Sequence, residues 1–157
     1  MTDSPTTPTQ IQIGLGAQYI KDFSFENPNA PQIFAELQTQ PQMSIDVDVM
    51  SRALGDGAFE SVLRLKVAAK IGEKTAFIAE LAYAGMFGLP QQLPEDQLKL
   101  FLLVEAPRLL FPFARAVISN AVREAGFPNI IIQPVDFLSL YAAQSGTVRA
   151  MQAVGAA

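Results

Sequence analysis

The sequence lacks three residue types that carry much of protein chemistry: it contains no cysteine, no histidine and no tryptophan. Without cysteine the chain can form no disulfide and has no thiol nucleophile. Without histidine it has neither an imidazole general base nor the commonest metal ligand, and a serine nucleophile would have no imidazole to activate it. We therefore expect that the protein is not an enzyme and that it holds no metal and no cofactor.

Charged residues are also scarce. Only 17% of the 157 residues are charged, whereas an average soluble domain has about 25%, and half of the residues are hydrophobic. A single domain cannot cover that much apolar surface, so we expect either an extensive interface between subunits or an exposed apolar binding surface. The 11 basic residues are never adjacent and are outnumbered by 15 acidic ones, which argues against nucleic acid as a partner.

Long hydrophobic runs are missing as well. The densest apolar stretch, residues 98–104, is far shorter than the roughly 20 residues that a membrane-spanning helix needs. Residues 1–10 contain no Lys or Arg and no apolar run, so they do not resemble a secretory signal peptide. Their Ser, Thr, Pro and Gln content predicts a disordered tail. We expect a cytoplasmic protein that does not insert into membranes.

Four segments alternate between apolar and polar residues, which is typical of strands with one buried face. Gly72 and Glu73 separate the last two by a tight turn, which predicts a hairpin and hence an antiparallel sheet. The four predicted strands are 11–25, 43–49, 59–71 and 75–87.

Helical spacing replaces this alternation after Pro94. Glu95 and Asp96 favour a helix start, apolar residues then recur every four positions, and Gly126 is a natural end. Two prolines inside this stretch, at 107 and 112, predict a kink. The helix is apolar around much of its circumference, so its second side is expected to meet another subunit. Asp136 is expected to cap a shorter C-terminal helix.

Together these patterns predict an α+β fold: a four-stranded antiparallel sheet packed with a long kinked helix and a shorter C-terminal helix. The folded domain is expected to span residues 11–144. Residues 145–157 are rich in Gly, Ala and other small residues and are expected to form a flexible C-terminal tail.

Several partial motifs do not predict a catalytic or ligand site. Gly14 and Gly16 begin a dinucleotide-binding pattern, but Tyr19 stands where its third glycine belongs, and the segment lies in a predicted strand. Asp46 and Asp48 share one face of a strand, an arrangement that could bind Ca²⁺ or serve as an acid–base pair. We interpret them as part of a solvated strand face.

Four segments, in order and spacing, resemble the SecB protein-export chaperones. They cover most of residues 11–141. The most specific is the run YIKDFSFENPNAP at residues 19–31; the others are 72–77 with Glu80, 110–115, and 127–137. The resemblance implies a subunit of the predicted fold that assembles as a homotetramer, a dimer of dimers.

The resemblance also implies a function. SecB proteins are ATP-independent holdases that bind unfolded precursor proteins in the cytoplasm, keep them competent for translocation and deliver them to the SecA ATPase of the Sec pathway. No catalytic residue is required. Two alternatives stay open: a chaperone of the same fold serving other clients, such as antitoxins, and a structural homo-oligomer that binds no client.

Two sites follow from the resemblance. The client groove of the family lies between the long connection after the first strand and the last helix, where Phe137 and Tyr141 could face Phe34 and Leu37. Each groove candidate could instead be an ordinary core residue. The candidates are Leu37, Met43, Ile45, Val47, Phe137 and Tyr141.

The second site is an acidic patch that faces SecA, whose small basic tail binds zinc; that zinc belongs to SecA. The patch maps to Asp22, Glu26, Ile78 and Glu80. The sequence departs from the family in two places. Lys74 stands where relatives often have an acid, and the last twelve residues lack the acidic character of many SecB tails.

Overall fold

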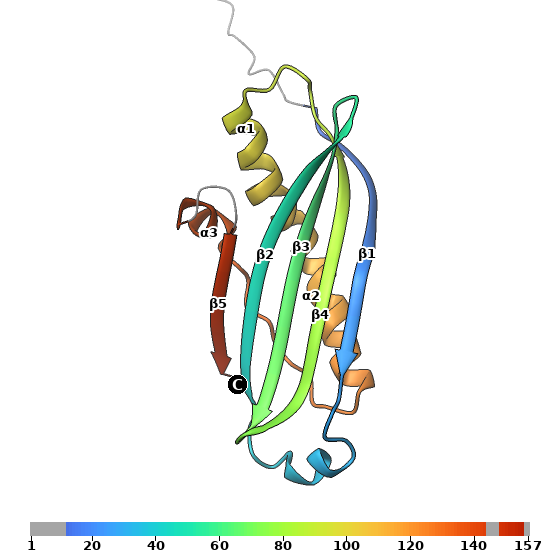
Figure 1. The fold of residues 1–157 in the computed structure, drawn as a ribbon, viewed down its shortest axis with the longest axis vertical. Helices are drawn as coiled ribbons and strands as arrows, with labels where there is room; N and C mark the ends of the chain where they lie inside the picture. The colour runs from blue at the N-terminus through green and yellow to red at the C-terminus, as the bar shows by residue number, and fades with distance from the viewer. Residues whose placement is uncertain (1–11, 144–147, 156–157) are drawn as a thin grey trace, which may run out of the picture.

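A computed structural model describes residues 12–143 and 148–155 (Figure 1). Its strands are β1 (Gly14–Glu26), β2 (Gln42–Gly55), β3 (Ala58–Ile71), β4 (Lys74–Gly88) and β5 (Val148–Gly155). Its helical elements are the short 3-10 helix η1 (Gln32–Glu36), α1 (Glu95–Leu100), the π-helical turn η2 (Phe101–Glu105), α2 (Ala106–Glu124) and α3 (Phe137–Ala143). The strands form one antiparallel sheet in the order β1-β4-β3-β2-β5. The predicted α+β fold is confirmed, with a fifth strand added at one edge.

Two tight hairpins join the three central strands. The turn between β2 and β3 contains Gly55, Asp56 and Gly57, all with positive φ (97°, 53° and 76°), a conformation that Gly and Asp tolerate. Gly72, with φ of 61°, opens the predicted turn between β3 and β4. β1 takes a different path, because the connection 27–41 crosses the end of the sheet and leaves β1 paired with β4 rather than β2 (Figure 1).

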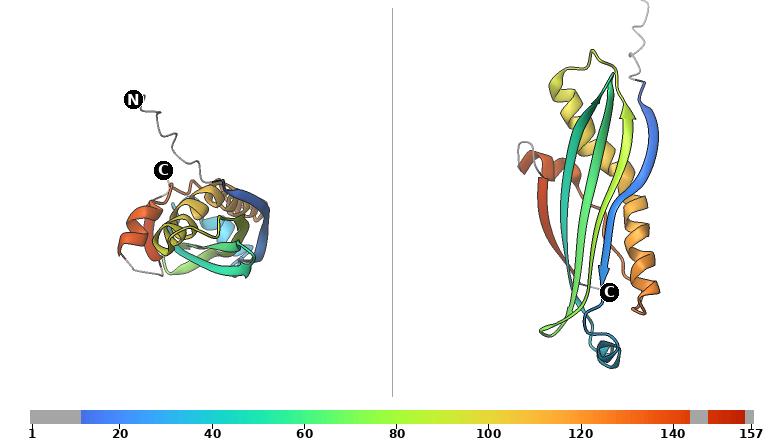
Figure 2. Two further views of the ribbon diagram at one scale, coloured as in Figure 1. Left: turned by 90° about the horizontal axis from the view of Figure 1, so that it is seen from above. Right: turned by 45° about the vertical axis from the view of Figure 1, so that its right-hand side comes forward.

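The sheet has one covered and one open face. Residues that are paired across neighbouring strands point to the same face of the sheet. Because side chains alternate along each strand, one row of paired residues lies entirely on one face and the next row lies on the other. We call the face under α2 the inner face and the opposite one the outer face (Figure 2, left). One inner row is Phe23–Leu81–Leu65–Val47, and the adjacent outer row is Ser24–Glu80–Lys66–Asp46.

The core lies between the inner face and one side of α2. Leu63, Val67 and Ala79 on the sheet are fully buried, as are Leu110 and Ile118 on the helix. These residues belong to one continuous apolar cluster that also includes the start of α3. The sequence pattern therefore describes the core correctly at these positions.

The helical segment runs without a break from α1 through η2 into α2. Pro107 lies in the first turn of α2, directly after the π-helical turn, and Pro112 lies inside the helix. Neither proline can donate a backbone N–H to the carbonyl four residues earlier. The two prolines therefore accompany an irregular, π-helical turn but do not interrupt the helical segment.

Both predicted helix boundaries are formed as expected. Gly126 has a φ of 95°, and the N–H of Phe127 donates to the carbonyl of Val122 at 3.2 Å, which closes the end of α2. At the start of α3, Asp136 accepts hydrogen bonds from the backbone N–H and the hydroxyl of Ser139 at 3.1 and 2.7 Å. These bonds hold the pKa of Asp136 below its ordinary value.

The C-terminal strand differs from expectation. Residues 145–157 were predicted to be a flexible tail, but residues 148–155 pair with β2 as the edge strand β5. Two Ala and a Gly among its eight residues have low strand propensity, so the pattern gave no signal, and the free edge of β2 supplies the partner. The predicted N-terminal tail, residues 1–10, lies outside the described residues.

Replacing Phe77 with Ala should strongly destabilise the protein. Phe77 is 1% exposed and its ring lies 5.5 Å from that of Phe25 and 5.1 Å from that of Phe127. Truncation leaves a cavity, so we expect the free energy of unfolding to fall by about 3–5 kcal/mol in urea titrations at fixed protein concentration. Leu54→Ala, at a 40% exposed position, is the control, with a change within about 0.5 kcal/mol. A loss below about 1 kcal/mol for Phe77→Ala would contradict this packing.

Candidate functional site

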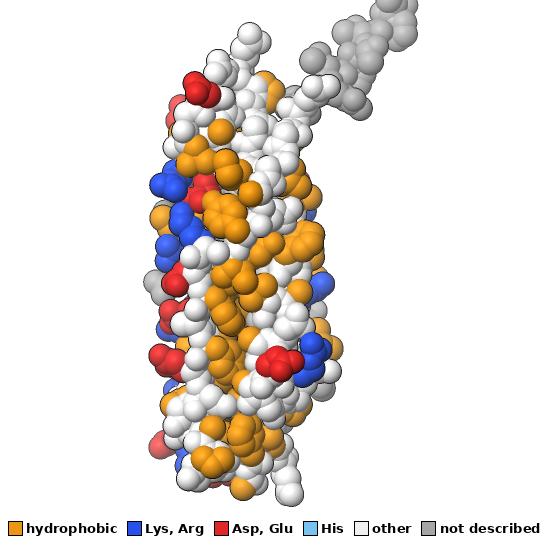
Figure 3. Space-filling model, turned by 90° about the vertical axis from the view of Figure 1, so that its right-hand side faces the viewer, with side chains coloured by type: hydrophobic (Ala, Val, Ile, Leu, Met, Phe, Trp, Pro, Cys, Tyr) orange, Lys and Arg blue, Asp and Glu red, His pale blue; other side chains and the backbone are white. Residues whose placement is uncertain are grey.

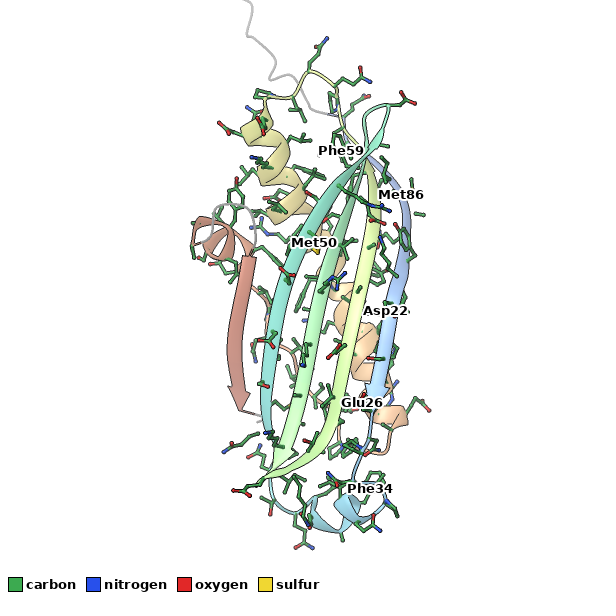
Figure 4. All side chains as sticks on the ribbon, in the orientation of Figure 1. Asp22, Glu26, Phe34, Met50, Phe59 and Met86 are labelled. Atoms are coloured by element: carbon green, nitrogen blue, oxygen red, sulfur yellow. The ribbon has the colours of Figure 1, made fainter. Side chains whose placement is uncertain are left out.

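The four residues of the predicted acidic patch lie together on the outer face. Glu26 on β1 is paired with Ile78 on β4, and Glu80 lies two residues further along β4, opposite Ser24. Asp22 follows on β1, two residues beyond Ser24, and shares the same face (Figure 4). Their proximity follows from β1 pairing with β4, a neighbour that the sequence pattern did not predict.

The carboxylates of this patch are accessible to a partner. Asp22 and Glu26 are exposed, and among the described residues neither has an ion-pair partner. Glu80 lies 3.4 Å from the ammonium group of Lys66, but both side chains are about half exposed, so this pair is largely hydrated. A surface of this kind presents negative charge without a large desolvation cost.

A shallow hollow of about 440 Å³ extends the acidic patch across the outer face. Asp46 and Asp48 on β2 border it, and the Oδ1 atom of each is buried without a hydrogen-bond partner among the described residues. Two cations balance part of the charge. The charged lining residues are Asp22, Asp46, Asp48, Arg64, Lys66 and Glu80. Asp46 and Asp48 thus lie on a strand face, as interpreted from the sequence, and border the same hollow as Asp22 and Glu80.

Glu60 forms a separate charged cluster on the outer face that ties three strands together. Its side chain is 3% exposed and accepts hydrogen bonds from Lys21 at 2.7 Å, from Arg52 at 2.9 Å and from the hydroxyl of Tyr19. Burial alone would raise the pKa of Glu60, but these three bonds outweigh it and lower the pKa from 4.5 to about 2. The hydrogen bond to Glu60 raises the pKa of Tyr19.

An apolar surface runs along the edge formed by β1 and α2. Phe113 on α2 is 52% exposed, and its ring lies 6.4 Å from that of Tyr83, which is paired with the exposed Ile20 on β1. Leu109 and Leu15 are also more than half exposed. Figure 3 shows hydrophobic side chains along most of this edge of the molecule. We call it the β1/α2 surface.

The predicted client-groove residues are mostly buried. Met43, Ile45 and Val47 form the inner row of β2 and are at most 5% exposed. Phe137, on α3, is 1% exposed and packs edge-on against Phe111. In this conformation these four groove candidates are core residues.

The two remaining groove candidates lie at the rim of the core. Leu37 and Tyr141 are partly buried and pack against the core cluster, but the loop and the helix do not face each other, because η1 lies at the lower end of the sheet and α3 beside its upper part (Figure 1). Phe34 packs against Phe127 at 5.3 Å instead of against α3. The sequence could not show this, because it does not give the height of each element along the sheet.

The sequence matches the family model of SecB, described as preprotein translocase subunit SecB, over residues 6–147. The chain belongs to the SecB family. It is 48% identical to the protein-export protein SecB of Rhodospirillum centenum over 136 residues, which cover 87% of this chain and 81% of that protein. It is 46% identical to SecB of Paramagnetospirillum magneticum over 154 residues, 97% and 98% of the two chains.

The fold is also that of a known chaperone. The SecB-like chaperone of Mycobacterium tuberculosis, solved with a peptide from an antitoxin, superposes with a TM-score of 0.67 at 11% identity and covers 78% of this chain and 90% of its own. The SecB family is a family of protein-export chaperones and not of enzymes. Within residues 12–143 and 148–155, no helix is long and apolar enough to cross a membrane, and no three acidic, His or Cys side chains are grouped as metal ligands.

Replacing Glu60 with Gln should destabilise the protein in a pH-dependent way. The pKa of Glu60 is lower in the folded state, so its stabilisation is complete above pH 4.5 and is lost as the pH falls toward 2. Lys21 and Arg52 are partly exposed and stay hydrated without it, so we expect a loss of about 1–3 kcal/mol at pH 7.

Urea unfolding of both proteins at pH 7 and pH 3 tests this expectation. The difference in the free energy of unfolding should shrink at pH 3, where wild-type Glu60 has already lost much of its advantage. Glu95→Gln, whose side chain is 79% exposed, is the control and should change little at either pH. A difference that stays constant with pH would show that the ionised form of Glu60 contributes nothing.

Proposed function

We propose that this protein is an ATP-independent holdase that binds unfolded precursor proteins in the cytoplasm, keeps them competent for translocation and delivers them to SecA. The observation that carries the proposal is the SecB match over residues 6–147. Its physical support is a chain that is half hydrophobic, with groove candidates along the inner row of β2 and an acidic patch on the opposite, outer face of the sheet. Two surfaces allow a client and SecA to bind at the same time.

The client is recognised through features that all unfolded chains share: exposed apolar side chains and a free backbone. The proposed groove follows the inner row of β2 from Leu37 past Met43, Ile45 and Val47 to α3, where Phe137 and Tyr141 lie. Leu37 and Tyr141, at the rim, are the first of these residues that a client would meet. Repeated weak contacts along such a groove, in several copies, give avidity without sequence specificity.

The assembly is a homotetramer, a dimer of dimers, and the β1/α2 surface is our candidate for one of its interfaces. No strand in the described part of the chain pairs with β1 on the side away from β4, which would otherwise be an open sheet edge. The exposed Ile20 and Phe113 supply apolar area beside that edge. A second copy placed there would bury both.

The acidic patch is the proposed docking surface for SecA. Asp22 and Glu26 are exposed and Glu80 is half exposed, so their charge can attract a basic segment of the partner from a distance. Ile78, half-buried and paired with Glu26 at one end of the patch, offers a small apolar contact. The zinc carried by the SecA tail stays with SecA.

A chaperone serving other clients is the second candidate function. It is favoured by the fold shared with the Mycobacterium tuberculosis SecB-like chaperone, which was solved with an antitoxin peptide. Such a protein would bind the same unfolded chains but would not depend on Asp22 or Glu26. A structural homo-oligomer without clients would instead bury all of its apolar surface between subunits.

Reversing two charges of the acidic patch should separate the two activities. Asp22→Lys with Glu26→Lys should weaken binding to SecA at least about tenfold, because attraction to a basic segment becomes repulsion, while binding to an unfolded client stays unchanged. Isothermal titration at low salt measures both affinities. Glu95→Lys with Asp96→Lys, in α1, is the charge-matched control. Unchanged SecA affinity in the patch variant would refute the assignment.

Placing a charge on the β1/α2 surface should break the assembly. Phe113→Asp puts a carboxylate where the proposed interface would exclude water, a cost of several kcal/mol. Light scattering coupled to size exclusion should then show a smaller particle with unchanged circular dichroism. Leu54→Asp, at another exposed apolar position, should leave the mass unchanged. A tetramer that survives Phe113→Asp would rule out this interface.

A further inference from the structure

The C-terminal strand covers part of the sheet edge that the proposed client groove borders. β5 pairs with β2 over eight residues, from Gln42 opposite Gly155 to Val49 opposite Val148. Beyond Val49, β2 continues to Gly55 without β5 beside it. The covered part of the edge is therefore the same stretch whose inner side chains are the groove candidates of β2.

The pairing of β5 with β2 relies on backbone chemistry that any extended polypeptide can offer. Three of the eight residues of β5 are Ala or Gly, which are depleted in strands. An antiparallel ladder needs only N–H and C=O groups, so an extended client segment could form the same ladder with β2. Occupation of this edge by β5 and by such a segment is mutually exclusive.

β5 can leave without disrupting the rest of the sheet. It is an edge strand that contacts β2 and α3, and among the described strands it pairs with β2 alone (Figure 1). The four longer strands keep their own pairing, and β3 and β4 keep their contacts with α2. Edge elements with so few neighbours open at a lower free energy than the global unfolding of the domain.

We propose that β5 is a built-in occupant of the client site: it covers the β2 edge when no client is bound and is displaced when an extended segment of an unfolded protein pairs with residues 42–49. The proposal rests on the holdase function proposed above. It places the competing strand directly beside Met43, Ile45 and Val47, the groove candidates of β2. It also accounts for the presence of β5, because an uncovered edge of β2 could pair with other chains and promote aggregation.

Displacement has a thermodynamic consequence. A client binds only the fraction of molecules in which β5 has left, so its apparent affinity is reduced by that fraction. The tethered strand also competes at a high effective concentration, which favours release of a client once part of it has been taken up elsewhere. Locking β5 in place should thus weaken client binding, and loosening it should strengthen client binding.

A disulfide between β2 and β5 tests, in the full-length protein, whether locking β5 in place weakens client binding. Ser44 and Ala153 are opposite each other in the β2–β5 register, and the natural chain has no cysteine to interfere. Ser44→Cys with Ala153→Cys should form an intramolecular disulfide under oxidation. The oxidised protein should bind reduced and carboxymethylated lactalbumin, a permanently unfolded chain, at least about tenfold more weakly, and a reductant should restore binding. Ser44→Cys alone, treated in the same way, is the control.

Two adjacent prolines in β5 test whether loosening this strand strengthens client binding. N–H groups of an edge strand alternate between facing its neighbour and facing away, so Ala150→Pro with Met151→Pro removes one donor to β2 in either register. This variant should bind the same unfolded chain about two- to tenfold more tightly. Ala156→Pro with Ala157→Pro, placed after the last residue of β5, is the matched control and should leave the affinity unchanged.

The outcomes separate this proposal from the holdase function. If the wild-type protein binds the unfolded chain and the confirmed lock leaves that affinity unchanged, the holdase function stands and the role of β5 is refuted. A disulfide that fails to form, or that joins two chains at low protein concentration, also refutes it. If the wild-type protein does not bind the unfolded chain at all, the holdase function fails, and the proposal for β5 fails with it.

Discussion

The structure depends on one constraint: a β-strand sends alternate side chains to opposite faces, so residues two apart share a face of the sheet and adjacent residues do not. In this sheet the inner rows carry Leu63, Leu65 and Val67, which α2 and its neighbours cover. The same alternation turns Asp22, Glu80 and the other charged residues outward. The alternation of apolar and polar residues along the strands therefore produces both the core and the acidic patch.

Helices cover the inner face of the sheet, but the two margins of the sheet need protection of their own. On one margin, β1 and α2 expose Ile20 and Phe113, and none of the described strands pairs with β1 on the side away from β4. On the other margin, β5 covers part of β2. A protein that binds unfolded chains needs apolar surface and backbone groups that are available, yet protected from random association. In the proposals above, a second copy covers the first margin, and β5 covers part of the second until a client displaces it.

Local sequence patterns predicted most helices and strands well, but they could not predict contacts between residues that are far apart in the sequence. The alternation at Met43–Val49 and the cap at Asp136 identified a strand and a helix because each depends on residues close in sequence. The neighbour of β1 depends on a connection that crosses the sheet. Glu60 gave no local signal, because its partners Lys21 and Tyr19 come from a strand about forty residues away. The burial of the groove candidates and the pairing of β5 likewise depend on how distant elements meet.

The central claim is that this protein recognises the unfolded state of other proteins and not a folded surface. The most direct measurement is the binding of one slow-folding secreted precursor, presented either freshly diluted from denaturant or in its native form, with no ATP in the buffer. We expect tight binding to the denatured form, no binding to the native form, and no effect of added ATP. Equal binding to both forms, or binding to neither, would contradict it.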